Sequence, residues 1–144
     1  MSDAAGVLVL IGRVLFGGIF AYSGWSAHIK MSSGMEGYAK QMNFPLPAIA
    51  GWPTGLWLIL GGLSLILGIW ADLGALMIIA FLLLAAAYFH RFWELPDADP
   101  QKMMQTGFFF RNVIGIAACL VFFGVFATLG DGLPYALTGS LFDL

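Results

Sequence analysis

The stretch that decides the fold reads LWLILGGLSLILGIW (56–70), AD (71–72) and LGALMIIAFLLLAAAYFHRFW (73–93). It holds two apolar runs, each close to the roughly 20 residues that a helix needs to cross a bilayer. The only formal charge between Leu56 and Tyr88 is Asp72. Because so short a connection sends the chain straight back, the stretch predicts an antiparallel transmembrane hairpin.

Two further apolar segments flank this hairpin. The four predicted spans cover about residues 6–27, 49–70, 73–92 and 108–129. Sixty per cent of the 144 residues are hydrophobic and ten per cent are charged, whereas a soluble domain carries about a quarter charged residues. We therefore predict an all-α fold: one domain, residues 1–144, forming an antiparallel four-helix bundle integral to the membrane and covered largely by lipid.

The first apolar run begins at Val7, has no Lys or Arg before it and contains Arg13. A cleaved signal peptide has a positive n-region and an uninterrupted apolar core of about 7–15 residues. We therefore expect the first segment to be retained as a span. Four spans place both termini on one side, the terminal side, and the two longer loops, 26–48 and 91–107, on the other, the loop side.

The distribution of basic residues predicts the orientation. The loop side carries Lys30, Lys40, Arg91, Lys102 and Arg111, whereas the loops and tails of the terminal side carry only the acids Asp3, Asp72, Asp131 and Asp143. Since basic loops stay in the cytoplasm, both termini are predicted to lie outside it. The net charge of −2 and the lack of a basic patch argue against nucleic acid as a partner.

The first loop shows a helical pattern. Met31, Met35, Tyr38 and Met42 recur at helical spacing among charged residues, which predicts a short amphipathic helix on the membrane surface. Prolines after residue 44 end it. The second loop, ELPDADPQKMMQT (94–106), is acidic, and we expect it to be ordered only where it touches the first.

Small residues predict where the helices pack. Lipid tails are as apolar as leucine, so helices in a membrane associate through close backbone approach at small residues. The packing positions predicted here are Gly17, Gly24, Gly61, Gly62 and Gly115. The single cysteine, Cys119, is interpreted as a small packing residue.

Arg13 lies inside the first span, where an arginine costs about 3 kcal/mol on insertion scales. It is therefore predicted to face the bundle interior. Two roles are open: a structural clamp on backbone carbonyls or on Asp72, or a ligand-binding site.

A second polar group is predicted on the loop side. His28 ends the first span, His90 ends the third, and Arg111 and Asn112 begin the fourth. The topology places these four residues at one membrane face, with Glu94 nearby, as a candidate ligand-binding cluster. The alternative is that each histidine is simply an interfacial residue. Two histidines with carboxylates do not have a metal-ligand spacing, so no metal site is predicted.

Several motifs together resemble the DoxX family of small four-helix bacterial membrane proteins. They are GRVLFGGIFAYSGWSAHIK (12–30), FPLP (44–47), LILGGLSLILGIWADLGAL (58–76), His90, FFFRNVIGIAACL (108–120) and GDGLPYALTG (130–139). Two positions depart from the family pattern: Leu58 stands where a glutamate is common, and Asp72 stands where the hairpin often has an arginine.

The resemblance implies a bacterial inner (plasma) membrane protein with respiratory or redox chemistry. It implies a membrane subunit of a redox complex with protein partners, and quinone as the cofactor to consider. The chain shows no catalytic motif of its own, so the alternative is a non-enzymatic scaffold or assembly partner. A small transporter is a third reading, but the four segments show no clear inverted repeat.

Overall fold

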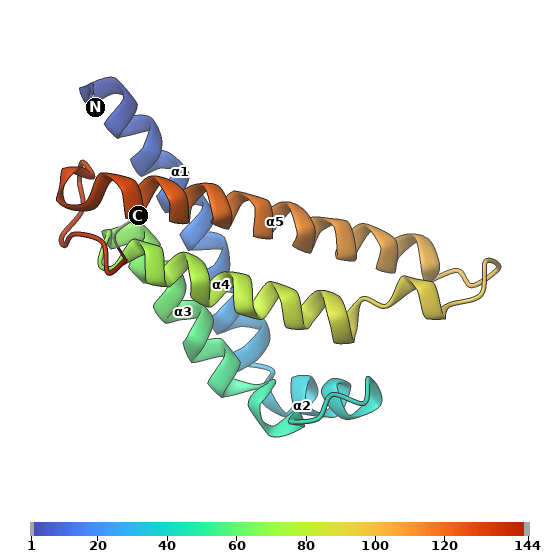
Figure 1. Cartoon of the computed structure of the whole chain (residues 1–144). Helices are drawn as coiled ribbons and strands as arrows, with labels where there is room; N and C mark the ends of the chain where they lie inside the picture. The colour runs from blue at the N-terminus through green and yellow to red at the C-terminus, as the bar shows by residue number, and fades with distance from the viewer. Residues whose placement is uncertain (1, 143–144) are drawn as a thin grey trace.

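The computed structural model describes residues 2–142, and every regular element among them is helical (Figure 1). The elements are α1 (Asp3–Ser23), η1 (Gly24–Ile29), α2 (Ser32–Gln41), η2 (Pro47–Ile49), α3 (Trp52–Leu67), α4 (Ala71–Leu84), η3 (Ala85–Phe89), η4 (Phe92–Glu94), α5 (Lys102–Leu129) and η5 (Gly130–Gly132). Of the short elements, η1 and η3 are π-helical continuations of α1 and α4. The all-helical prediction is confirmed.

Three helical stretches are long and apolar enough to cross a membrane: Asp3–Ile29, Ala71–Glu94 and Lys102–Gly132. The remaining apolar helix, α3, has 16 residues, which at 1.5 Å per residue is about 24 Å. It is shorter than the predicted segment 49–70 because Gly68 and Trp70 adopt left-handed backbone conformations that end it. In contrast, α5 begins at Lys102, well before the predicted residue 108.

The long helices form two pairs that diverge. α1 packs along α3, α4 packs along α5, and α3 packs along α4 through the hairpin, but α1 and α5 make no comparable contact. In Figure 1 the pairs lie together near the two termini and separate toward α2 and the loop before α5. The arrangement is thus more open on the loop side than the compact bundle that the sequence predicts.

The main core lies where the pairs meet. Leu65, Ile78, Cys119 and Phe126 are at most 1% exposed there, and Ala75 is fully buried beside them. Cys119 therefore has the packing position predicted for it. At the packing glycines the backbones come very close: a Cβ on Gly17 would lie 2.5 Å from the Gly62 carbonyl oxygen, and one on Gly24 would lie 2.5 Å from that of Gly55.

The surface helix predicted in the first loop is present as α2. Ala39 of α2 is fully buried, in a small cluster with Phe44 against Tyr88 and Phe89. The Tyr38 hydroxyl donates to the Phe89 carbonyl at 3.5 Å. α2 is thereby attached to the end of η3, across the loop side of the molecule.

The second loop is tied to the first, as predicted. Arg91 Nη2 donates to the Met42 carbonyl at 3.1 Å. The expectation that residues 94–106 are ordered only at this contact is wrong, because residues from Lys102 onward belong to α5.

Candidate functional site: a cavity between the two helix pairs

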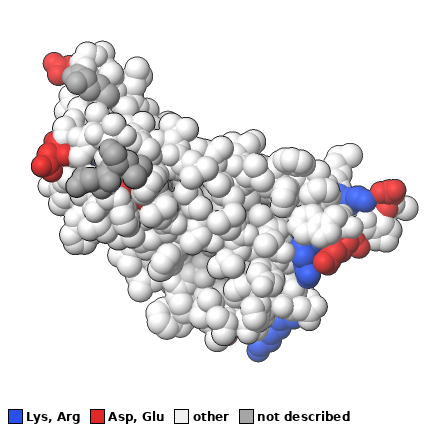
Figure 2. Space-filling model, in the orientation of Figure 1, with Lys and Arg blue, Asp and Glu red and all other residues white. Residues whose placement is uncertain are grey.

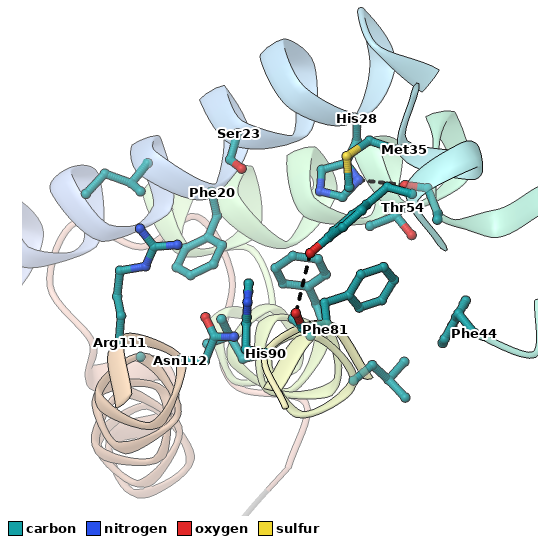
Figure 3. Close-up of a pocket in the computed structure, with 18 of the residues that line it drawn as sticks. Phe20, Ser23, His28, Met35, Phe44, Thr54, Phe81, His90, Arg111 and Asn112 are labelled. Carbon is teal, nitrogen blue, oxygen red and sulfur yellow. Dashed lines mark hydrogen bonds between the residues drawn. The ribbon is translucent and has the colours of Figure 1, made fainter. Parts of the chain in front are cut away.

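A cavity of about 580 Å³ occupies the space between the diverging pairs (Figure 3). Its walls come from α1, η1, α2, α3, α4, η3 and α5. Most of the lining is aromatic or aliphatic, with Phe16, Phe20, Phe44, Phe81 and Phe89 among it. Such a volume lies in the range of about 300–1,000 Å³ typical of small-molecule sites.

All four loop-side residues predicted as a cluster line this cavity: His28, His90, Arg111 and Asn112. They come from three helices that the two-pair arrangement brings around one space. Figure 3 shows Phe20 and Ser23 on the α1 side and Arg111 and Asn112 on the α5 side. Glu94, which the topology also placed nearby, pairs instead with Arg91 at 3.0 Å and does not line the cavity.

His28 is held in one orientation by the backbone. Its Nδ1 lies 2.7 Å from the Ala50 carbonyl oxygen. A carbonyl can only accept, so Nδ1 donates and the neutral ring leaves Nε2 as an acceptor. No described residue makes a hydrogen bond to Nε2, and the ring meets Phe81 edge-on at 5.6 Å. The π-helical turn η1 carries His28, and such turns are frequent at functional sites.

Asn112 is a buried residue with a hydrogen-bond donor that lacks an acceptor in the described part of the chain. It is 5% exposed, and its Nδ2 has no hydrogen-bond acceptor among residues 2–142. A buried donor without an acceptor costs about 1–3 kcal/mol. The Asn112 amide is therefore free to donate to an acceptor of a bound molecule.

His90 and Arg111 complete the polar lining. His90 Nδ1 lies 2.9 Å from Gln105 Oε1, which fixes the ring against α5. The Arg111 guanidinium lies 4.7 Å from the centre of the Phe108 ring, a cation–π contact. Within the part of the chain that the structure describes, no carboxylate pairs with Arg111. The cavity thus carries an unpaired cation beside an unsatisfied amide.

Sequence reasoning did not identify the wall formed by α2. Met35 and Tyr38 of α2 line the cavity together with Ser23 and Thr54. The amphipathic pattern of the first loop predicted that these residues face the membrane side of α2. It did not indicate that a cavity lies beneath them, because the shape of that cavity depends on how far the helix pairs separate.

Arg13 lies elsewhere, in the packed region near the termini. It is fully buried and does not line the cavity. Its Nε donates to the Leu65 carbonyl at 2.8 Å, and its terminal nitrogens donate to Ile66, Pro134 and Tyr135 carbonyls at 3.1–3.2 Å. All three guanidinium nitrogens are therefore engaged by backbone of α3 and of the closing segment 133–142.

Asp72 is not the partner of Arg13. Its carboxylate accepts from the backbone N–H of Leu73 at 2.9 Å, and from those of Leu141 and Phe142 at 2.7 Å each. Arg13 and Asp72 thus hold the same closing segment at two places, one as donor and one as acceptor. No group of three or more His, Cys, Asp or Glu side chains suited to a metal occurs among the described residues.

The model of the DoxX family matches residues 8–91, more than half of the chain. The chain belongs to the DoxX family. The match runs from α1 to just beyond His90, so it includes both histidines of the cavity and ends before Arg111 and Asn112. No curated protein and no solved structure matches the chain.

Proposed function

We propose that this DoxX-family protein is a membrane subunit of a redox complex and that its cavity binds a quinone. The observation that carries the proposal is the unsatisfied Asn112 amide in a cavity whose lining is mostly aromatic and aliphatic. A quinone offers a flat ring with two carbonyl oxygens, which are acceptors for such a donor. The aromatic and aliphatic walls suit the ring and the first part of an apolar tail.

The polar groups of the cavity match both redox forms of such a ligand. The Asn112 Nδ2 can donate to a quinone carbonyl. The His28 Nε2, an acceptor in the neutral ring, can receive a hydrogen bond from a quinol hydroxyl. The cavity thus offers a donor to the quinone form and an acceptor to the quinol form.

The proposal includes the orientation in the membrane. On the face that Figure 2 shows, basic residues gather on the loop side, while the terminal side shows acidic residues only. In this proposal α3 spans the membrane together with the three longer helical stretches. Since basic loops prefer the cytoplasm, the cavity lies near the cytoplasmic face and both termini lie outside.

A C-terminal alkaline phosphatase fusion should be active and a C-terminal fluorescent protein dim. The reverse would overturn the orientation.

A scaffold role has one observation in its favour. Phe92, Trp93, Phe109 and Phe110 form an aromatic cluster on the loop side, with Trp93 52% and Phe110 53% exposed. Such rings suit either the membrane interface or a partner subunit. A scaffold would keep its partners when the cavity is altered, which separates it from the redox proposal.

Quinone titration of the full chain in lipid nanodiscs tests the proposal. Asn112→Leu should weaken quinone binding about tenfold or more, since the lost bond is worth about 1.5 kcal/mol. Thr128→Val is the matched control, because Thr128 also lies on α5 but bonds to the Gly124 carbonyl, away from the cavity. Absence of quinone binding by the wild-type chain, or equal binding by Asn112→Leu, would contradict the proposal.

A further inference from the structure

We infer that the cavity opens sideways into the bilayer between α1 and α5, and that its ligand is a membrane-resident amphiphile with a long apolar tail in this opening. The inference rests on the ligand site of the proposed function and specifies the ligand class and its route. The opening, called the slot below, is flanked by Ile19 of α1 and Ile114 of α5.

The two flanking residues belong to the cavity wall and to the outer surface at once. Both line the cavity, yet Ile19 is 66% exposed and Ile114 is 70% exposed. A wall residue with that much free surface marks a place where the cavity reaches the exterior. The contact between α1 and α5 that joins Phe16 to Phe122, with ring centres 5.4 Å apart, lies further toward the termini, and Ile19 and Ile114 stay exposed beyond it.

Apart from Arg111, the exposed residues that surround the slot are apolar. On α1 the exposed neighbours of Ile19 are Leu15 at 64% and Tyr22 at 72%, and on α5 Val121 is 67% exposed beyond Ile114. These residues lie on helical stretches long and apolar enough to cross a membrane. The slot therefore faces lipid, where a hydrophobic molecule is already concentrated and a water-soluble one is not.

The aqueous route to the cavity is covered. Met35 and Tyr38 of α2 form part of the wall on the loop side, and the Tyr38 hydroxyl bonds to the Phe89 carbonyl. Beside them Phe44 packs edge-on against Tyr88 at 5.1 Å. α2 and its aromatic partners thus cover part of the loop side of the cavity, and the most exposed isoleucines of the cavity wall lie at the slot.

The polarity of the cavity sets the direction of the ligand. The groups that lack protein partners, Asn112 Nδ2 and His28 Nε2, are on residues at most 6% exposed, while isoleucines flank the slot. A head with oxygen atoms therefore lies inside and its tail points out through the slot. Arg111 is three residues before Ile114, on the same face of α5, so its free guanidinium borders the path of the head.

Filling the slot tests the inference. Wild type, Ile114→Trp and Leu120→Trp are placed in nanodiscs and titrated with a quinone bearing a long isoprenoid tail and with the same ring lacking the tail. Leu120 is the matched control because it is 56% exposed on α5 and does not line the cavity. Ile114→Trp should weaken the tailed quinone about tenfold or more and the tail-free ring less than about threefold, with Leu120→Trp changing neither by more than about threefold. An equal effect on both probes, or none on either, would overturn the slot.

A second measurement keeps the slot separate from quinone binding. A nitroxide spin label is attached to Ser23→Cys, which lies in the cavity wall. The label reports collisions with lipid-soluble oxygen and with a water-soluble nickel chelate. The native Cys119 is fully buried and does not compete for the label. Oxygen access close to that of a lipid-facing Leu120→Cys label supports the slot, and dominant nickel access overturns it. Lipid access without any quinone binding would retain the slot and refute the proposed function.

Discussion

The two ends of the molecule treat buried polar side chains in opposite ways. Near the termini, Arg13 and Asp72 are fully buried, and their hydrogen bonds are completed by backbone groups of the closing segment. In the loop-side cavity, Asn112 is almost as deeply buried, but its Nδ2 has no acceptor among the described residues. Completed bonds indicate a structural role, and an incomplete one is consistent with the proposed ligand site.

This comparison decides between the two roles left open for Arg13. A guanidinium that donates to four carbonyls has little capacity left for a ligand. We therefore propose that Arg13 acts as the structural clamp. Its bonds to Pro134 and Tyr135 fasten the chain after α5 against the end of α3.

Breaking the clamp should give the largest effect. Arg13→Leu leaves four buried or partly buried carbonyls without their donor, so the free energy of unfolding should fall by about 3 kcal/mol or more. Thermal unfolding in detergent measures this, with Arg13→Lys as the control that keeps a cation and part of the bonds. A mutant as stable as wild type would refute the clamp.

Helix approach in the packed half gives the next effect. A Cβ on Gly62 would collide with the Gly17 carbonyl oxygen of α1, so Gly62→Leu must push α1 and α3 apart. We expect a loss of about 2–3 kcal/mol. Leu83→Ala is the comparison. Leu83 is 53% exposed, so lipid can take the place of the removed side-chain atoms and the loss of stability should be smaller. Equal shifts in unfolding temperature would mean that the packing faces are misassigned.

Asp72→Asn should have a smaller effect. The carboxylate Oδ2 accepts two backbone N–H bonds at 2.7 Å, and an amide oxygen accepts them without the charge, which costs about 1–2 kcal/mol. Hydrogen exchange of the Leu141 and Phe142 amides should accelerate. Asp3→Asn, on the same side but exposed in the first turn of α1, should change stability by a few tenths of a kcal/mol. Unchanged exchange at residues 141–142 would contradict the role of Asp72.

The sequence predicted the loop-side cluster because the order and direction of the spans are enough to place its residues at one membrane face. His28, His90 and Arg111 each lie at an end of an apolar run, and the short hairpin turn determines which ends meet. The membrane character followed equally from composition. The family followed from the order of several weak motifs, and the family match confirms it over residues 8–91.

What the sequence could not predict depends on packing. The divergence of the two pairs, and hence the cavity, depends on packing that brings α1 against α3 and α4 against α5, with much less contact between α1 and α5. Two of the partners of Arg13 lie in residues 133–142, a segment without helical or strand periodicity, so the sequence left backbone carbonyls and Asp72 as alternatives. Glu94 was misplaced because its 3₁₀ turn directs it to Arg91.

The most direct test compares the two ends in one experiment: unfolding temperature and quinone affinity for Arg13→Leu and Asn112→Leu, both in nanodiscs below the unfolding range. The account predicts opposite results. Arg13→Leu should lose stability and keep its quinone affinity, whereas Asn112→Leu should keep or gain stability, because an unsatisfied buried donor is removed, and lose affinity about tenfold or more. Loss of affinity in Arg13→Leu together with unchanged affinity in Asn112→Leu would contradict the division between a completed structural end and an incomplete binding end.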